Sequence, residues 1–454
     1  MPWGSVLQAL VNQAVKRSDY LQDRLEELQS KRFNNAEPSH FLIKILDNIN
    51  NNIRRRLAEF TQEKFQTILD FPTYLDNLDL AKVYANTIHD IYEYIFLIET
   101  STVESSPPAI IPAIERIARK LIPVPDKFHI LICPSLRGWY AYKDLLTPMS
   151  SNFPSDILNE DKLKEIKYLF VLNYPFFLKH DMLCHASLLH ELGHLFIIAN
   201  DLAGQAWEKK IKEIKEIPRE ISAQKILYFL TEYLADIFAV CLIGPAFLFA
   251  LLEAASPLAS PDQQTGEHPP LLLRIRNILD TLDVYNQRFT RFVNFDFAKK
   301  AEKFLDSLNQ FTSLDNLRDV LDEETPNPVE IYRYLEPALV WAKKEIGEKI
   351  PHSLHFSPTE ELFETYIKKF VKQGIPPSAS RDRDEKGKKV TPLSLGELLN
   401  AVWLYQVVEL QNPGPLKPSV EKSPHTGKLR DLRRLTQLAI QQIEVLHLYE
   451  NAKV

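Results

Sequence analysis

Apolar residues recur every three or four positions through the first 121 residues, and this spacing places them on one face of a helix. The clearest examples are Val6, Leu7, Leu10, Val11 and Val15, and later Tyr84, Ile88, Ile91, Ile95 and Ile98. Polar or proline-bearing breaks at 34–38, 71–72 and 105–108 divide the pattern into segments. The pattern therefore predicts several long amphipathic helices, which form an N-terminal helical region over residues 1–125.

Two short apolar runs follow, and both contain aromatic and β-branched residues. Phe128–Cys133 is followed directly by Pro134, and Tyr168–Leu172 ends shortly before Pro175. Short apolar runs that are closed by proline are typical of β-strands. We therefore predict that these runs are two members of a small sheet.

The helical spacing returns after Leu183 and continues to about Ile346, with breaks at 257–270 and 325–328. Within it, residues 234–252 approach the roughly 20 apolar residues that cross a bilayer. Asp236 and the pair Gly244-Pro245 interrupt this run, so we expect a buried helix that breaks near the pair and resumes, not a membrane span. Residues 374–389 and 411–428 are polar and contain proline, which predicts flexible loops between the last helices. The predicted fold class is mainly α, with a small sheet (α+β).

Composition narrows the functional classes. Only 12 of 454 residues are glycine, which favours a helix-rich protein, and the formal net charge of −6 provides no general attraction for nucleic acid or an anionic membrane. The chain contains no phosphate-binding glycine loop, no G-x-G-x-x-G fingerprint and no G-x-S-x-G elbow. Three scattered cysteines and an N-terminus without a signal-peptide pattern favour a cytoplasmic location.

The most informative sequence is His190-Glu191-Leu192-Gly193-His194, an H-E-x-x-H motif inside an apolar helical run. On a helix, positions i and i+4 are about 40° apart around the axis and about 6 Å apart along it, so both imidazoles can reach one metal ion. Glu191 then lies beside the ion, where a carboxylate can take a proton from a water that zinc has acidified to a pKa near ~7. The motif predicts a zinc site with Glu191 as general base.

A catalytic zinc needs a third protein ligand and an open position. The metzincin continuation is excluded, because Ile197 and Asn200 stand where its glycine and third histidine belong. Downstream, Glu232 and Asp236 form an i, i+4 acidic pair in a second apolar helical segment. Glu232 can ligate the metal, and Asp236 can accept the ring N–H of a ligating histidine and fix its tautomer.

This arrangement resembles the glutamate-zincin (gluzincin) metallopeptidases, in which H-E-x-x-H is followed on a second helix by E-x-x-x-D, often E-x-x-A-D; residues 232–236 read E-Y-L-A-D. Residues 267–275, E-H-P-P-L-L-L-R-I, are similar to the H-P-P and R-I that follow the acidic motif in the CAAX prenyl protease and bacterial heat-shock membrane protease group. The resemblance covers about residues 168–279. Those relatives are integral membrane proteins, and membrane location and prenylated substrates are not carried over to this chain.

The resemblance implies roles for individual residues. It makes His190, His194 and Glu232 the zinc ligands, Glu191 the general base and then general acid, and Asp236 the residue that orients a ligand. His268 is a candidate for stabilising the carbonyl oxygen, with capping of the helix that starts at 269–270 as its alternative role. Arg274 is a candidate for holding Asp236 or Glu232 in place through a charge-assisted pair.

Alternatives remain for two of these roles. Tyr228 and Tyr233 are further candidates for stabilising the carbonyl oxygen, although packing roles are more typical of such tyrosines. His185 and Asp201 are alternative metal ligands. An extended substrate could pair along an edge strand near the motif helix, and Tyr168, Phe170 and Leu172 are the candidates for that strand.

We therefore predict a zinc endopeptidase with a zincin-like core at 126–280, between the helical region 1–125 and two further regions, a helical one at 281–373 and C-terminal helices with flexible loops at 374–454. It would hold one Zn²⁺ per chain and act on a polypeptide, without nucleic acid or a membrane span, and its N-terminal helices could bind a protein partner. Two other functions stay open. One is a helical regulatory or interaction protein with a structural or vestigial zinc site, which would bind zinc without proteolysis. The other is a zinc hydrolase that acts on a non-peptide amide.

Overall fold

Helices make up most of the chain in a computed structural model, and a small mixed three-stranded sheet accompanies them, which confirms the predicted fold class. The structure describes residues 3–33, 36–60, 71–102, 109–123, 128–135, 140–154, 157–158, 166–175, 178, 181–212, 221–255, 268–321, 327–371, 394–410 and 424–451. The chain divides into two compact units. The first unit comprises residues 1–108, 124–136 and 141–173, and the second comprises 109–123, 137–140 and 174–454. The strands that we assigned to the 126–280 region therefore group with the N-terminal helices.

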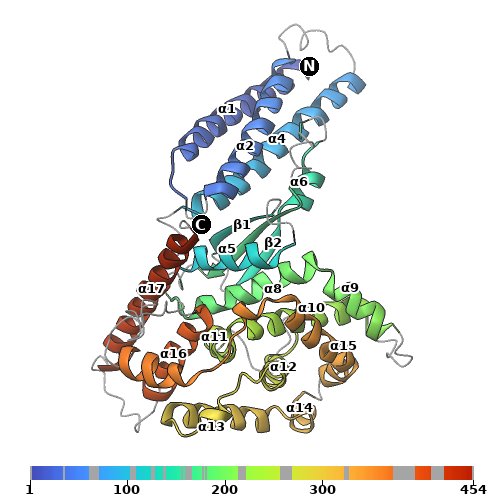
Figure 1. Cartoon of the computed structure of the whole chain (residues 1–454). Helices are drawn as coiled ribbons and strands as arrows, with labels where there is room; N and C mark the ends of the chain where they lie inside the picture. The colour runs from blue at the N-terminus through green and yellow to red at the C-terminus, as the bar shows by residue number, and fades with distance from the viewer. Residues whose placement is uncertain are drawn as a thin grey trace. The chain divides into compact units, whose positions relative to one another are not determined.

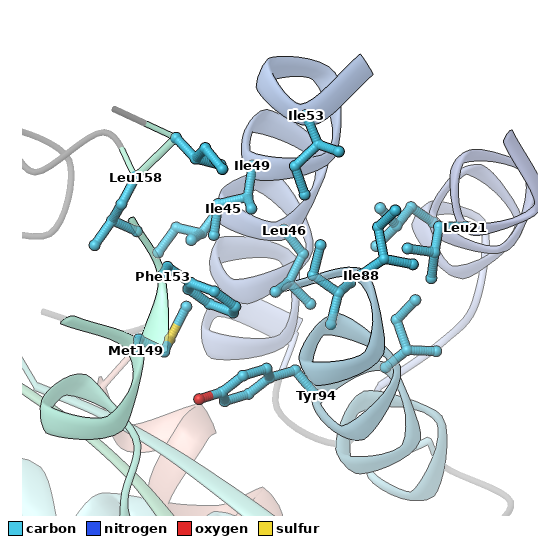
Figure 2. Packing of buried hydrophobic residues seen from close by; sticks show 14 of the residues in the cluster. Leu21, Ile45, Leu46, Ile49, Ile53, Ile88, Tyr94, Met149, Phe153 and Leu158 are labelled. Atoms are coloured by element: carbon cyan, nitrogen blue, oxygen red, sulfur yellow. The ribbon is translucent and has the colours of Figure 1, made fainter. Parts of the chain in front are cut away.

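Three long helices dominate the first unit: α1 (Trp3–Gln29), α2 (Ala36–Ala58) and α4 (Phe71–Thr100). They pack against one another (Figure 1). Of the residues that the spacing placed on the apolar face of the first helix, Leu7 and Val11 are buried, whereas Val6 and Leu10 are exposed and correct the prediction at these two positions. Figure 2 shows Leu21, Leu46 and Ile88 meeting in this core, and all three are fully buried. Each such side chain contributes roughly 1.5–3 kcal/mol by leaving water, so the shared core holds the helices together.

The N-terminal breaks fall close to the predicted positions, with one local difference. Pro38 and Pro72 lie inside the first turns of α2 and α4 instead of in loops before them. Proline is tolerated there because the first backbone N–H groups of a helix have no partner within that helix. The break expected at 105–108 lies outside the described residues.

The sheet contains β1 (Phe128–Ser135), β2 (Ala141–Asp144) and β3 (Tyr168–Pro175) in the order β1-β3-β2. The two predicted strands are confirmed as β1 and β3. The sequence did not indicate β2, because its four residues are only partly buried or exposed and its second half is charged. β2 runs antiparallel to β3, with Ala141 opposite Asn173 and Asp144 opposite Phe170.

This strand order corrects the predicted substrate-pairing edge. β3 lies in the middle of the three described strands, with a hydrogen-bonded neighbour on each side. Its backbone N–H and C=O groups are thus engaged by the sheet itself, whereas adding a substrate strand requires an edge with unpaired groups. Tyr168, Phe170 and Leu172 therefore do not form an edge strand, and that prediction is wrong.

The second unit is built from helices that surround two central ones, α8 (Leu188–Ala199) and α10 (Ala223–Ile243). The other described α-helices are α5 (Ile110–Leu121), α9 (Leu202–Ala206), α11 (Pro245–Ala255), α12 (Leu271–Val284), α13 (Asp296–Phe311), α14 (Leu314–Val320), α15 (Pro328–Lys349), α16 (Leu395–Tyr405) and α17 (Pro424–Asn451). Short 3₁₀ or π segments lie at η3 (Cys184–Ser187), η4 (Trp207–Ile211), η5 (Thr290–Phe292), η6 (His352–Leu354), η7 (Leu362–Val371) and η8 (Gln406–Leu410). Helix α6 (Leu146–Asn152) belongs to the first unit.

The apolar run at 234–252 breaks where the sequence predicts. α10 ends at Ile243, Gly244 adopts a φ of 54°, and α11 begins at Pro245. A positive φ just after a helix favours glycine, and proline fits the first position of the next helix. Among the described helices, α10 is long and apolar enough to cross a membrane by length and composition, and 83% of its most apolar 18-residue window is buried inside the protein.

Of the two predicted C-terminal loops, the structure describes only the end of the second. Residues 374–389 lie outside the described residues, as do 411–423 of the second stretch. Residues 424–428 are helical, because α17 begins at Pro424. Proline is well suited to that first helical position, where its missing N–H costs no hydrogen bond.

Candidate metal centre

Helices α8 and α10 approach each other closely at Gly193, the fourth residue of the H-E-x-x-H motif. A Cβ atom at this position would lie 3.0 Å from Ala235 Cα and 3.1 Å from both Ala235 O and Phe238 Cδ1. Contacts this short mean that a side chain at position 193 would push the two helices apart by a few tenths of an ångström, so glycine favours the observed close packing. The close approach brings both motif histidines within reach of Glu232, which lies one turn before Ala235 on α10.

The three predicted ligands converge on one point. His190 Nε2 lies 3.2 Å from His194 Nε2 and 3.2 Å from Glu232 Oε2, and His194 Nε2 lies 3.3 Å from Glu232 Oε1. Ligands at 2.0–2.1 Å from a tetrahedral zinc are about 3.3 Å from one another. The three side chains therefore form a buried group that can hold a metal ion.

A hydrogen bond fixes the orientation of the His190 ring. Its Nδ1 lies 2.9 Å from Asp236 Oδ1, and because a carboxylate can only accept, Nδ1–H must be the donor. Nε2 then faces His194 and Glu232, so it can ligate a metal ion once its own proton is displaced. On its other side, His190 stacks on Phe247 of α11, with ring centroids 5.8 Å apart and an interplanar angle of 7°.

The protonation of the metal-free group reflects strong coupling among its members. Burial and the charge of Arg274 lower the pKa of His190, but the Asp236 and Glu232 carboxylates outweigh them and raise it to about 9. Burial also opposes the charge on Glu232, yet the charge of His194 and the close ring nitrogens of His190, His194 and His268 hold the pKa of its carboxyl group well below the usual range. The group thus carries a proton that a metal cation must displace on binding.

Glu191 lies on the same helix as the two histidines and is 7% exposed, but it does not belong to the convergent group. Burial raises the pKa of its carboxyl group, and the charges of His190 and His194 only partly offset this effect. A buried carboxylate with a raised pKa beside a metal group is suited to accept a proton from water.

Arg274 from α12 supports the group from a third helix. It donates two hydrogen bonds to the fully buried Asp236, from Nε to Oδ2 at 3.0 Å and from Nη2 to Oδ1 at 2.6 Å. Its Nη1 also lies 3.8 Å from Glu232 Oε2. Of the two carboxylates that the sequence proposed as partners of Arg274, Asp236 therefore receives the bidentate pair, which fixes the acceptor of His190 Nδ1–H.

Replacing Arg274 with lysine should weaken zinc binding about 10- to 100-fold, because a point charge cannot reproduce the bidentate pair that fixes Asp236. Competition with a chromogenic chelator measures this change. Arg276→Lys is the matched control, since Arg276 lies on the same helix but pairs with Asp280, at 3.0 Å. Equal zinc affinities for the two variants would show that Asp236 does not depend on Arg274.

His268 contacts the metal group and does not cap a helix. Its Nδ1 lies 2.9 Å from Glu232 Oε2, and its side chain is 49% exposed. α12 begins after Pro270 and receives no hydrogen bond from a capping side chain. The alternative capping role is therefore wrong. His268 instead contacts Glu232 and is half-exposed, whereas His190, His194 and Glu232 are buried.

The other candidate residues lie outside the group. His185 is fully buried, and its Nδ1 lies 3.2 Å from the Tyr140 hydroxyl; Asp201 is the left-handed residue before α9. Neither joins the group of described residues that can hold a metal. Tyr233 packs edge-on against Tyr332, with ring centroids 5.3 Å apart. Tyr228 is 40% exposed, and its hydroxyl accepts a hydrogen bond from Gln224.

Sequence reasoning missed two contributors, Gly193 as the contact point of two helices and Phe247 as the platform for His190. A glycine inside an apolar helical run is a signal of close packing, so the first could have been found. The second has no sequence signal, because Phe247 reaches His190 only through the break at Gly244 and the packing of α11.

In comparisons with known proteins, no family model, no curated protein and no solved structure matches this chain.

Proposed function

We propose that this chain is a zinc-dependent peptidase of the gluzincin type. The observation that carries the proposal is the combination of three convergent ligand side chains among the described residues with a buried carboxylate, Glu191, on the motif helix. Structural zinc sites usually have four protein ligands, whereas catalytic sites have three and leave one position for water or substrate. The ordered H-E-x-x-H and E-Y-L-A-D motifs, both in apolar helices, support the same function.

Each residue then has a defined task. A zinc ion supplies Lewis acidity, which acidifies water and polarises a carbonyl group. Glu191 accepts a proton from the attacking water and returns it to the leaving amine. Asp236 and Arg274 keep His190 in the ligating tautomer. To His268 we assign the donation of a hydrogen bond to the developing oxyanion, and its contact with Glu232 and its half-exposed side chain support this role.

Metal analysis and proteolysis together test the proposal. The chain, purified without chelator, should contain about one zinc per molecule and should cleave an unstructured protein such as casein. 1,10-Phenanthroline should abolish cleavage, and added Zn²⁺ should restore it. Bound zinc with no cleavage of peptides would contradict the proposal and favour a regulatory protein with a structural zinc. Cleavage of a non-peptide amide alone would favour the amide hydrolase.

A further inference from the structure

A second candidate site lies in the same unit, away from the metal group. A cavity of about 940 Å³ is lined by the C-terminal end of α12, by α15 and by the segment that follows α15 to His355. None of the metal-group residues lines it. Its volume is in the range of cavities that bind small organic molecules.

The cavity contains an unusual amine. Lys343 lines it and is only 6% exposed, and within the described part of the chain its side chain makes no hydrogen bond or ion pair. The next residue, Lys344, has the ordinary arrangement: its side chain is 74% exposed and its Nζ lies 3.8 Å from Glu348.

The charges around Lys343 leave its amine without a counterion. Asp280 is held by Arg276, at 3.0 Å, and by the Tyr332 hydroxyl, at 3.3 Å. Asp280, Asp283 and Glu336 favour the protonated amine and Arg276 opposes it, but burial outweighs them and lowers the pKa of Lys343. A larger share of this amine than of an exposed one is therefore neutral near pH 7.

The lining also restricts what can bind. It carries four carboxylates, those of Asp280, Asp283, Glu336 and Glu348, against two lysines. This excess of acids disfavours phosphates and carboxylates. Val284, Leu339 and Val340 give the cavity an apolar wall. The arrangement suits an uncharged or cationic organic molecule that presents an electrophilic carbon to the amine.

We propose that Lys343 is a nucleophilic lysine in a second ligand site, which takes uncharged or cationic aldehydes or ketones by imine formation. The neutral amine adds to the carbonyl carbon, its two hydrogens leave with the carbonyl oxygen as one water molecule, and a C=N bond replaces the C=O bond. No oxidant or reductant takes part in this step.

Reductive trapping tests the proposal on the full-length, unmodified chain. Benzaldehyde with cyanoborohydride at pH 7 should convert imines to stable benzylamines, and fragment-ion mass spectrometry locates them. Lys343 should be labelled faster than Lys344, because its lowered pKa leaves a larger share of its amine neutral at pH 7. Labelling that follows exposure, with Lys344 equal to or ahead of Lys343, would overturn the proposal.

Two further measurements separate a binding site from a merely reactive amine. Labelling of Lys343 should saturate as the benzaldehyde concentration rises, while that of Lys344 should rise linearly. The anionic 4-formylbenzoate should label Lys343 more slowly than benzaldehyde does, because the acidic lining repels it. A linear dependence at Lys343, or faster labelling by the anion, would contradict a ligand site of this chemistry. Lys343→Met should remove the label at this position, and Lys344→Met should retain it.

Discussion

Replacing Glu191 with glutamine should reduce peptide cleavage by at least about 100-fold while zinc content stays at one ion per chain. Glutamine has nearly the same shape but cannot accept the proton of the attacking water, and a general base typically contributes 10²- to 10⁴-fold. Zinc should remain because Glu191 lies outside the convergent ligand group. Initial rates of casein cleavage, with elemental analysis of the same samples, measure both effects.

The control is the same glutamate-to-glutamine substitution at a glutamate outside the metal group. Glu208→Gln alters an exposed glutamate that pairs with Lys212, at 2.8 Å, and should leave both rate and zinc content unchanged. A Glu191→Gln variant that cleaves at the unaltered rate would remove Glu191 from the mechanism. A variant that has lost its zinc would instead identify Glu191 as a ligand.

Replacing Glu232 with alanine should weaken zinc binding by more than about 100-fold, which exceeds the loss expected for a residue that only supports a ligand. The change removes one of three ligands and leaves His190 and His194 alone at the centre. Zinc content after dialysis against a weak chelator, and affinity by chelator competition, measure the effect. Cleavage should be lost with the metal.

Two companion variants keep this result interpretable. Glu232→Gln retains the volume of the side chain but not its charge, so this variant should also bind zinc weakly. Its thermal unfolding should remain cooperative, which shows that the protein is still folded. Asp201→Asn changes the alternative acidic ligand and should bind zinc normally. Full zinc occupancy in Glu232→Ala would show that Glu232 is not the third ligand. A loss of zinc in Asp201→Asn would identify Asp201 as a ligand.

The sequence predicted the helices well because their apolar spacing and their breaks are local. The core residues Leu7 and Ile88 follow from periodicity alone, and Gly244-Pro245 marks a helix break that the sequence shows directly. Strands were harder to predict. β1 and β3 have apolar runs, but β2 has none and exists because it pairs with β3. Strand order is likewise invisible in sequence, since pairing joins residues distant along the chain, and β3 proved to be central.

For the candidate metal group, the local sequence was enough to predict which residues of the motif helix could act together. His190, Glu191 and His194 occupy fixed positions on one helix, and the helical repeat alone places both imidazoles on one face. The tertiary structure decided everything that depends on contacts between helices. Gly193 lets α8 and α10 approach closely enough for Glu232 to lie 3.2–3.3 Å from both histidines, and α12 brings Arg274 to Asp236. Such contacts depend on packing between segments that no local pattern specifies, which is why the same sequence left the roles of Arg274 and His268 open.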